Sequence, residues 1–331
     1  MIFFFAPLLL AMALYAVLQS HVLPMGVLFL IVTNGLGLNQ LHLGPSWFFY
    51  LDKENRKYWL EHKNKAWTFF AGPPLVIIIT TLLYLVTPWL VYVLFTAWGI
   101  QHFVAQNIGF LVLYHNKANN EAIAPRVLQS RSLWAGAYFF SAFYVEKVIL
   151  KGQPSIAFNV IAALLAVWLV FNMVLYVREL SRQMDSGARL NVPGFAFWVM
   201  SVFYFAPFAL LNYDEKDAFM VPGVLHWTQY LCLNYMLVKY KYVDERKSLL
   251  PPGGAMTWFW GLAWAIFIVS FCMHAEKLAN AAVAPVLIGA LMGISNAHYF
   301  QDAFLWRFRE QYQRDSIMPY IFEARRRGNE A

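Results

Sequence analysis

The sequence predicts an all-α membrane protein, a polytopic bundle of about ten transmembrane helices with both termini in the cytoplasm. Composition, the lengths of the apolar segments and the distribution of basic residues predict this fold class. Of 331 residues, 60% are hydrophobic and only 13% are charged. A soluble domain of this length normally carries more charge on its surface. The composition therefore indicates that lipid covers much of the chain.

Apolar segments recur along the whole chain at close to the length of about 20 residues that a membrane-spanning helix needs. We expect spans at residues 2–19, 24–50, 67–86, 88–115, 133–150, 156–178, 193–212, 222–242, 257–275 and 281–306. The first segment has no Lys or Arg before its apolar run, so we interpret it as a retained span and not as a signal peptide. Since no long linker divides the chain, residues 1–331 are predicted to form a single integral-membrane domain that ends in a short cytoplasmic tail, residues 309–331.

The basic residues predict the orientation of these spans. Of the 25 Lys and Arg residues, 21 follow an even-numbered span, and the other four are Lys147, Lys151, Lys216 and Lys277. Basic loops stay on the cytoplasmic side of a membrane, so both termini are expected there, as in a multi-pass protein of the bacterial inner membrane. Basic cytoplasmic loops also account for the net charge of +7 without a nucleic-acid partner.

Four histidines are predicted to reach a common depth in the bilayer. His42, His102, His226 and His298 lie ten, fifteen, thirteen and nine residues from the next cytoplasmic charge. At about 1.5 Å of rise per helical residue, these spacings correspond to roughly 14–22 Å. Ionisable residues inside a membrane are costly to bury, so they indicate a functional site.

Polar residues accompany three of these histidines within about one helical turn: Gln106 after His102, Gln229 and Tyr230 after His226, and Asp302 after His298. Four imidazoles, with or without a carboxylate, suit iron, zinc, copper or manganese and do not suit calcium. We therefore predict a transition-metal site, with iron as the first expectation.

The polar neighbours have predicted roles in the chemistry. Asp302 is expected to be a fifth ligand or to orient His298, because residues four apart on a helix share one face. Gln106 and Gln229 are expected to contact the substrate or dioxygen, or to orient a ligand.

Two short motifs carry a resemblance to known proteins. The segments His226-Trp-Thr-Gln-Tyr230 and His298-Tyr-Phe-Gln-Asp302-Ala-Phe-Leu-Trp306 resemble the HxxQY and HYxxDxxxW motifs of an uncharacterised family of bacterial multi-pass membrane proteins. More distantly, the architecture is similar to that of the Brp/Blh-type membrane β-carotene dioxygenases, which implies a non-haem iron held by intramembrane histidines. The chain lacks the HxxxH and HxxHH boxes of membrane desaturases and hydroxylases.

Three functions follow as hypotheses. The first is a non-haem iron oxygenase, a membrane-embedded oxidoreductase that takes a lipid or isoprenoid substrate from the bilayer and uses dioxygen and a redox donor. If zinc occupies the site, hydrolysis or isomerisation becomes the natural chemistry. The second is an electron-transfer protein in which two of the histidines bind a b-type haem. The third is a proton-coupled transporter that uses His298 and Asp302.

Overall fold

Helices make up nearly all of the described structure. The computed structural model describes residues 9–11, 13, 14, 16, 17, 38–115, 120–210, 219–242 and 254–328. Within these ranges, the strands are two residues each, β1 (Glu121–Ala122) and β2 (Arg189–Leu190), and they pair in parallel. The all-α prediction is therefore confirmed.

The chain divides into two compact units, each built from segments distant in sequence. Among the described residues, unit 1 comprises residues 13, 14, 16, 17, 100–115, 120–210 and 219–222, and unit 2 comprises residues 9–11, 38–99, 223–242 and 254–328. The helices of unit 1 are α9 (Arg126–Tyr144), the π-helical η4 (Val145–Ile149), α10 (Ile156–Asp185), α11 (Val192–Val202) and α12 (Pro207–Leu210). Those of unit 2 are α3 (Leu38–Leu41), α4 (Gly44–Phe48), the 3-10 helix η2 (Phe49–Leu51), α5 (Lys53–Glu61), α6 (Lys63–Ala66), the π-helical η3 (Trp67–Ala71), α7 (Gly72–Val86), α14 (Ala255–Ala279), α15 (Ala284–Leu305) and α16 (Gln311–Gly328). Helix α8 (Pro88–His115) begins in unit 2 and ends in unit 1, and α13 (Met220–Lys241) begins in unit 1 and ends in unit 2.

Three helices of the described ranges are long and apolar enough to cross a membrane, and they cover Lys63–Val86, Ile156–Asp185 and Ala255–Lys277. Large apolar side chains such as Leu75, Leu82, Leu164 and Ile268 are exposed on them. Exposed apolar surface on this scale marks contact with lipid or with another protein. The first predicted span and residues 24–37 of the second lie outside the described residues, apart from a few positions between 9 and 17.

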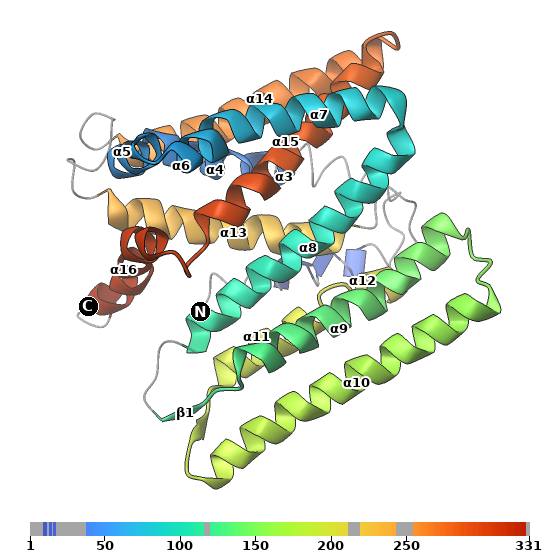
Figure 1. Ribbon diagram of the computed structural model, residues 1–331, viewed down its shortest axis with the longest axis vertical. Coiled ribbons are helices and arrows are strands. Elements are labelled where there is room, and N and C mark those ends of the chain that lie inside the picture. The colour runs from blue at the N-terminus through green and yellow to red at the C-terminus, as the bar shows by residue number, and fades with distance from the viewer. Residues whose placement is uncertain are drawn as a thin grey trace. The chain divides into compact units, whose positions relative to one another are not determined.

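Helices α7 and α15 pack side by side in unit 2, as Figure 1 shows. Gly289 and Gly293, one turn apart on α15, bring the two backbones close together. A Cβ atom at Gly293 would lie 2.9 Å from the Ile77 Cα atom, and one at Gly289 would lie 3.0 Å from the Thr81 Cα atom. Small residues at such spacing let helices approach closely where lipid, and not water, surrounds them.

Replacing Gly293 with leucine is therefore expected to destabilise unit 2, because the new side chain would force α7 and α15 apart. Overpacking of this kind typically costs about 1–3 kcal/mol. The thermal unfolding midpoint in detergent would measure the loss. Gly261→Leu on α14 is the matched control, since a Cβ atom there meets nothing within 4 Å. Equal midpoints for the two variants would contradict the packing argument.

The end of the second predicted span, residues 38–50, differs from the single helix that the sequence predicted. The chain forms α3, a turn at His42 and Leu43, then α4 and η2. Pro45 explains the break, because proline has no N–H group for the carbonyl of Leu41 and its ring clashes with a continuing helix. Pro45 instead occupies the first turn of α4, where the missing donor costs little.

The seventh predicted span, residues 193–212, is also interrupted in the structure. Helix α11 ends at Val202, a turn follows, and α12 begins at Pro207. Pro207 cannot donate a hydrogen bond to the Phe203 carbonyl, and the backbone N–H of Ala206 donates to it instead at 2.9 Å.

Proline also affects the start of α7, where the helix widens and does not break. Pro73 cannot donate to the carbonyl of Phe69, and the helix widens to the π form over η3. The Tyr50 hydroxyl donates to that carbonyl at 2.5 Å, and the Gln301 side-chain amide donates to the Tyr50 oxygen at 3.2 Å. These bonds connect η2, η3 and α15.

The C-terminal segment forms α16 and packs against α5. The ring of Tyr312 stacks on that of Tyr58 at a centroid distance of 3.8 Å, and its hydroxyl donates to the Asn55 side-chain carbonyl at 2.9 Å. Burial and the neighbouring Asp52 carboxylate raise the pKa of the Tyr312 phenol. The phenol therefore stays protonated and remains a donor over the physiological pH range.

An ion pair is fully buried where the C-terminal end of α13 meets the start of α5. The Lys241 Nζ atom lies 2.6 Å from Asp52 Oδ2, and neither side chain is exposed. The Tyr242 hydroxyl donates to the same oxygen at 2.6 Å, while Asp52 Oδ1 accepts from the backbone N–H of Asn55 at 2.9 Å and caps α5. The sequence predicts that both charged residues lie at the cytoplasmic boundary. In the structure they form an ion pair that is buried inside unit 2.

Candidate metal centre

His42 occupies the turn that Pro45 creates between α3 and α4. Its Nδ1 atom donates to the backbone carbonyl of Asn39. A hydrogen bond of this type fixes the proton on Nδ1, so that the Nε2 lone pair can donate to a metal ion. Within the part of the chain that the structure describes, His42 Nε2 is buried and has no hydrogen-bond partner. A non-helical backbone inside a membrane protein often marks a binding site.

Helix α13 supplies His226 and Gln229, which are fully buried. They lie three residues apart and therefore project from neighbouring positions on one side of the helix. Among the described residues, neither amide atom of Gln229 has a hydrogen-bond partner. A buried amide without a partner is costly, so Gln229 is suited to contact a bound molecule, and its role toward substrate or dioxygen stays a prediction.

Helix α15 supplies His298, and the structure brings it together with the two other histidines. The imidazole centroids lie 4.8 Å apart for His42 and His298, 5.2 Å for His42 and His226, and 6.2 Å for His226 and His298. One ring nitrogen from each residue lies within 4.8 Å of the others, and all three side chains are buried. Two nitrogens bound to one zinc ion at about 2.1 Å are roughly 3.4 Å apart in tetrahedral geometry. Small side-chain adjustments therefore suffice for the three to share an ion.

A hydrogen-bonded network surrounds His298. Ser46 Oγ lies 2.7 Å from His298 Nδ1, and the Ser46 hydroxyl reaches Asp302 Oδ1 at 3.3 Å. The Tyr230 hydroxyl donates to the same carboxylate oxygen at 2.7 Å. One assignment satisfies every donor: His298 Nδ1–H donates to Ser46, and Ser46 and Tyr230 donate to Asp302. In this tautomer the Nε2 atom of His298 carries the lone pair that a metal would bind.

The two carboxylate oxygens of Asp302 have different neighbours, and its role as a fifth ligand or as an orienting partner stays a prediction. Its Oδ1 atom belongs to the network that orients His298, as described above. Its Oδ2 atom lies 3.7 Å from His298 Nε2, a separation that two ligands of one ion can have.

His102 and Gln106 lie one turn apart on α8, within unit 1. His102 is buried. Because the three clustered histidines belong to unit 2, the roles of His102 as a fourth ligand and of Gln106 beside it stay predictions.

Ser46 is the residue of this network that the sequence did not indicate. Serine is common in apolar helices, and nothing in its spacing connects it to residues about 250 positions away. The Gly44-Pro45 pair beside it was the available signal, because helix breaks at membrane depth tend to occur at binding sites.

Removing the Ser46 hydroxyl is expected to weaken metal binding without abolishing it. Partners that orient a metal-binding histidine typically contribute about 10–100-fold to affinity. Titration of Ser46→Ala with Co²⁺, followed by its visible absorption, would measure the change. Ser295→Ala on α15 is the control, since among the described residues that hydroxyl donates to Leu291 O of its own helix. An unchanged affinity in Ser46→Ala would contradict the role of the network.

Comparison of the chain with family models, curated proteins and solved structures finds no match.

Proposed function

We propose that this protein is a membrane-embedded, metal-dependent oxidoreductase, a non-haem iron oxygenase that acts on a lipid or isoprenoid substrate. The observation that supports it is the convergence of His42, His226 and His298 from three separate segments, with ligand atoms within 4.8 Å of one another. Imidazole ligands suit iron, and also zinc, copper or manganese. The proposal includes the ten-span topology, both termini in the cytoplasm and a place in the bacterial inner membrane.

The residues of the site would each have a defined task. His42, His226 and His298 would hold the metal, and Ser46, Tyr230 and Asp302 would fix the orientation of His298. Gln229 would position the substrate or dioxygen through its amide. A bound iron would supply Lewis acidity and the capacity to activate dioxygen.

The surroundings of the cluster support a lipophilic substrate. Trp227 packs against His42 with a ring-centroid distance of 6.0 Å, and Leu231 and Ala263 are buried in the apolar cluster around Leu41, the residue before His42. An apolar, water-excluding site suits oxygen chemistry because it protects reactive intermediates from side reactions.

One pair of the clustered histidines, His226 and His298, is poorly placed to hold a haem. Axial imidazoles approach haem iron from opposite faces, and the porphyrin fills the space around the axis between them. For His226 and His298 as such a pair, the His42 ring occupies that space, with its centroid within 5.2 Å of both.

Elemental analysis and a visible spectrum of the full chain, purified in detergent without added metal, would test the proposal. We expect close to one iron per chain, no Soret band, and oxygen uptake when isoprenoid substrates are supplied. A Soret band would identify the electron-transfer alternative. Failure to bind any transition metal, even after anaerobic addition of Fe²⁺, would overturn the proposal and favour transport through His298 and Asp302.

A further inference from the structure

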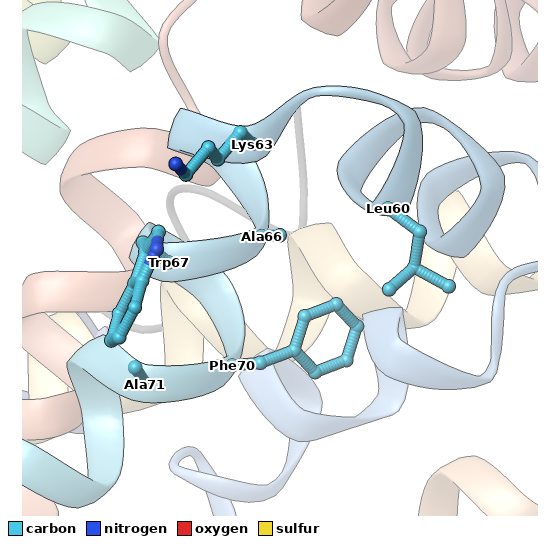
Figure 2. Close-up of a pocket in the computed structure, with 6 residues that line it drawn as sticks. All are labelled: Leu60, Lys63, Ala66, Trp67, Phe70 and Ala71. Carbon is cyan, nitrogen blue, oxygen red and sulfur yellow. The ribbon is translucent and has the colours of Figure 1, made fainter.

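An open groove lies on the surface of unit 2, at the start of the candidate span Lys63–Val86. Its volume is about 430 Å³, within the range of small-molecule sites. Its lining residues are Leu60, Lys63, Ala66, Trp67, Phe70 and Ala71. In Figure 2, Leu60 and Phe70 point toward one another, and the side chains of Lys63 and Trp67 project to the same side of their helix.

The sequence builds this groove by helical spacing. Lys63, Ala66, Trp67, Phe70 and Ala71 follow the i, i+3, i+4, i+7, i+8 pattern and therefore share one helix face. The two alanines leave space between larger neighbours, and Leu60 of α5 closes the side. The aromatic side chains are not turned inward: Trp67 is 66% exposed and Phe70 is 39% exposed.

The groove combines this apolar surface with the ammonium group of Lys63. Lys65 pairs with Glu310 of the C-terminal segment. Across the described residues, by contrast, no carboxylate forms an ion pair with Lys63. Lys63 therefore adds a positive charge to a groove that the exposed Trp67 and Phe70 side chains also line.

The position along the chain is that of a membrane–water interface. Lys63 is the first residue of the apolar span, and the charged helix α5 precedes it. Tryptophan is enriched at the headgroup level of membranes, and basic residues there attract anionic headgroups.

We propose that this groove binds a phospholipid with an anionic headgroup. The phosphate pairs with Lys63, and the upper part of an acyl chain lies against Trp67, Phe70 and Leu60. A zwitterionic lipid fits less well, because its own cation is repelled by the ammonium of Lys63. The site is independent of the histidine cluster and does not rest on the proposed oxygenase activity.

Quenching of Trp67 fluorescence by brominated lipid tests this assignment. The full chain and its Trp67→Phe variant are reconstituted in phosphatidylcholine vesicles that contain a low mole fraction of brominated phosphatidylglycerol or brominated phosphatidylcholine. The difference between the two proteins isolates Trp67 from the other twelve tryptophans. We expect about a fivefold preference for the anionic lipid, the effect of one basic residue near the membrane surface.

The matched charge variants are Lys63→Gln and Lys57→Gln, each also made with Trp67→Phe. Lys57 is an exposed lysine of α5 that pairs with Glu61 and does not line the groove. We expect Lys63→Gln to abolish the preference and Lys57→Gln to keep it, with excess inorganic phosphate leaving quenching unchanged.

Three outcomes would overturn the proposal. The first is equal quenching by the two lipids, and the second is equal effects of the two lysine variants. The third is protection of Trp67 from both lipids together with a dimer in light scattering, which would identify a second copy of the chain as the occupant.

Discussion

The His226→Ala variant is expected to lose the transition metal that we propose for the histidine cluster. His226 is fully buried, and its ring lies 5.2 Å from that of His42, so its loss removes one of the three imidazoles that converge there. Loss of a direct ligand should exceed the roughly 10–100-fold effect of an orienting partner. We therefore expect metal affinity to fall by more than about 100-fold, measured by elemental analysis after dialysis against a weak chelator.

His274→Ala is the matched control, because His274 lies on α14 and its Nδ1 atom bonds to the Ser270 carbonyl of its own helix at 2.8 Å. That variant should retain its metal. A His226→Gly variant supplied with free imidazole should regain the metal, which separates loss of a ligand from loss of folding. Full metal occupancy in His226→Ala would show that the ion binds elsewhere.

The Lys241→Met variant is expected to be among the least stable that can be made at one position. It would leave Asp52 charged inside the protein, with the Tyr242 hydroxyl and the Asn55 N–H as its remaining partners. Removing one partner of a buried ion pair typically costs about 3–5 kcal/mol. Thermal unfolding in detergent should show a large fall in the midpoint.

The double variant Asp52→Asn/Lys241→Met should recover much of that loss, because no buried charge remains. Lys57→Met is the surface control: the side chains of Lys57 and Glu61 are 77% and 57% exposed, and exposed pairs contribute little to stability. A similar small effect for Lys57→Met and Lys241→Met would mean that Asp52 and Lys241 are solvated.

The all-α fold class could be predicted from the sequence, because composition and the lengths of apolar segments depend on whether water or lipid surrounds a chain. The helix breaks near Pro45 and Pro207 could not be predicted in the same way. A hydropathy window averages over a proline, and only the fold decides whether the helix bends or ends there. The burial of Lys241 could not be predicted either, because its local sequence is typical of the basic C-terminal end of a helix.

The histidine cluster was partly predictable for a related reason. Helical rise converts sequence distance into depth, so His226 and His298 could be expected at one level. Depth does not determine how each helix is rotated about its axis, and so it could not indicate which side chains meet. The contacts of Ser46 depend on that rotation and on the turn at His42, and both are properties of the packed structure.

The close approach of α15 to α7 has a consequence for association between copies of the chain. In a bilayer, two glycines four residues apart often join helices of separate molecules. Here the backbone at Ile77 and Thr81 of the same chain already occupies that surface. The instability expected for Gly293→Leu should therefore be a folding effect, with the same magnitude at every protein-to-lipid ratio.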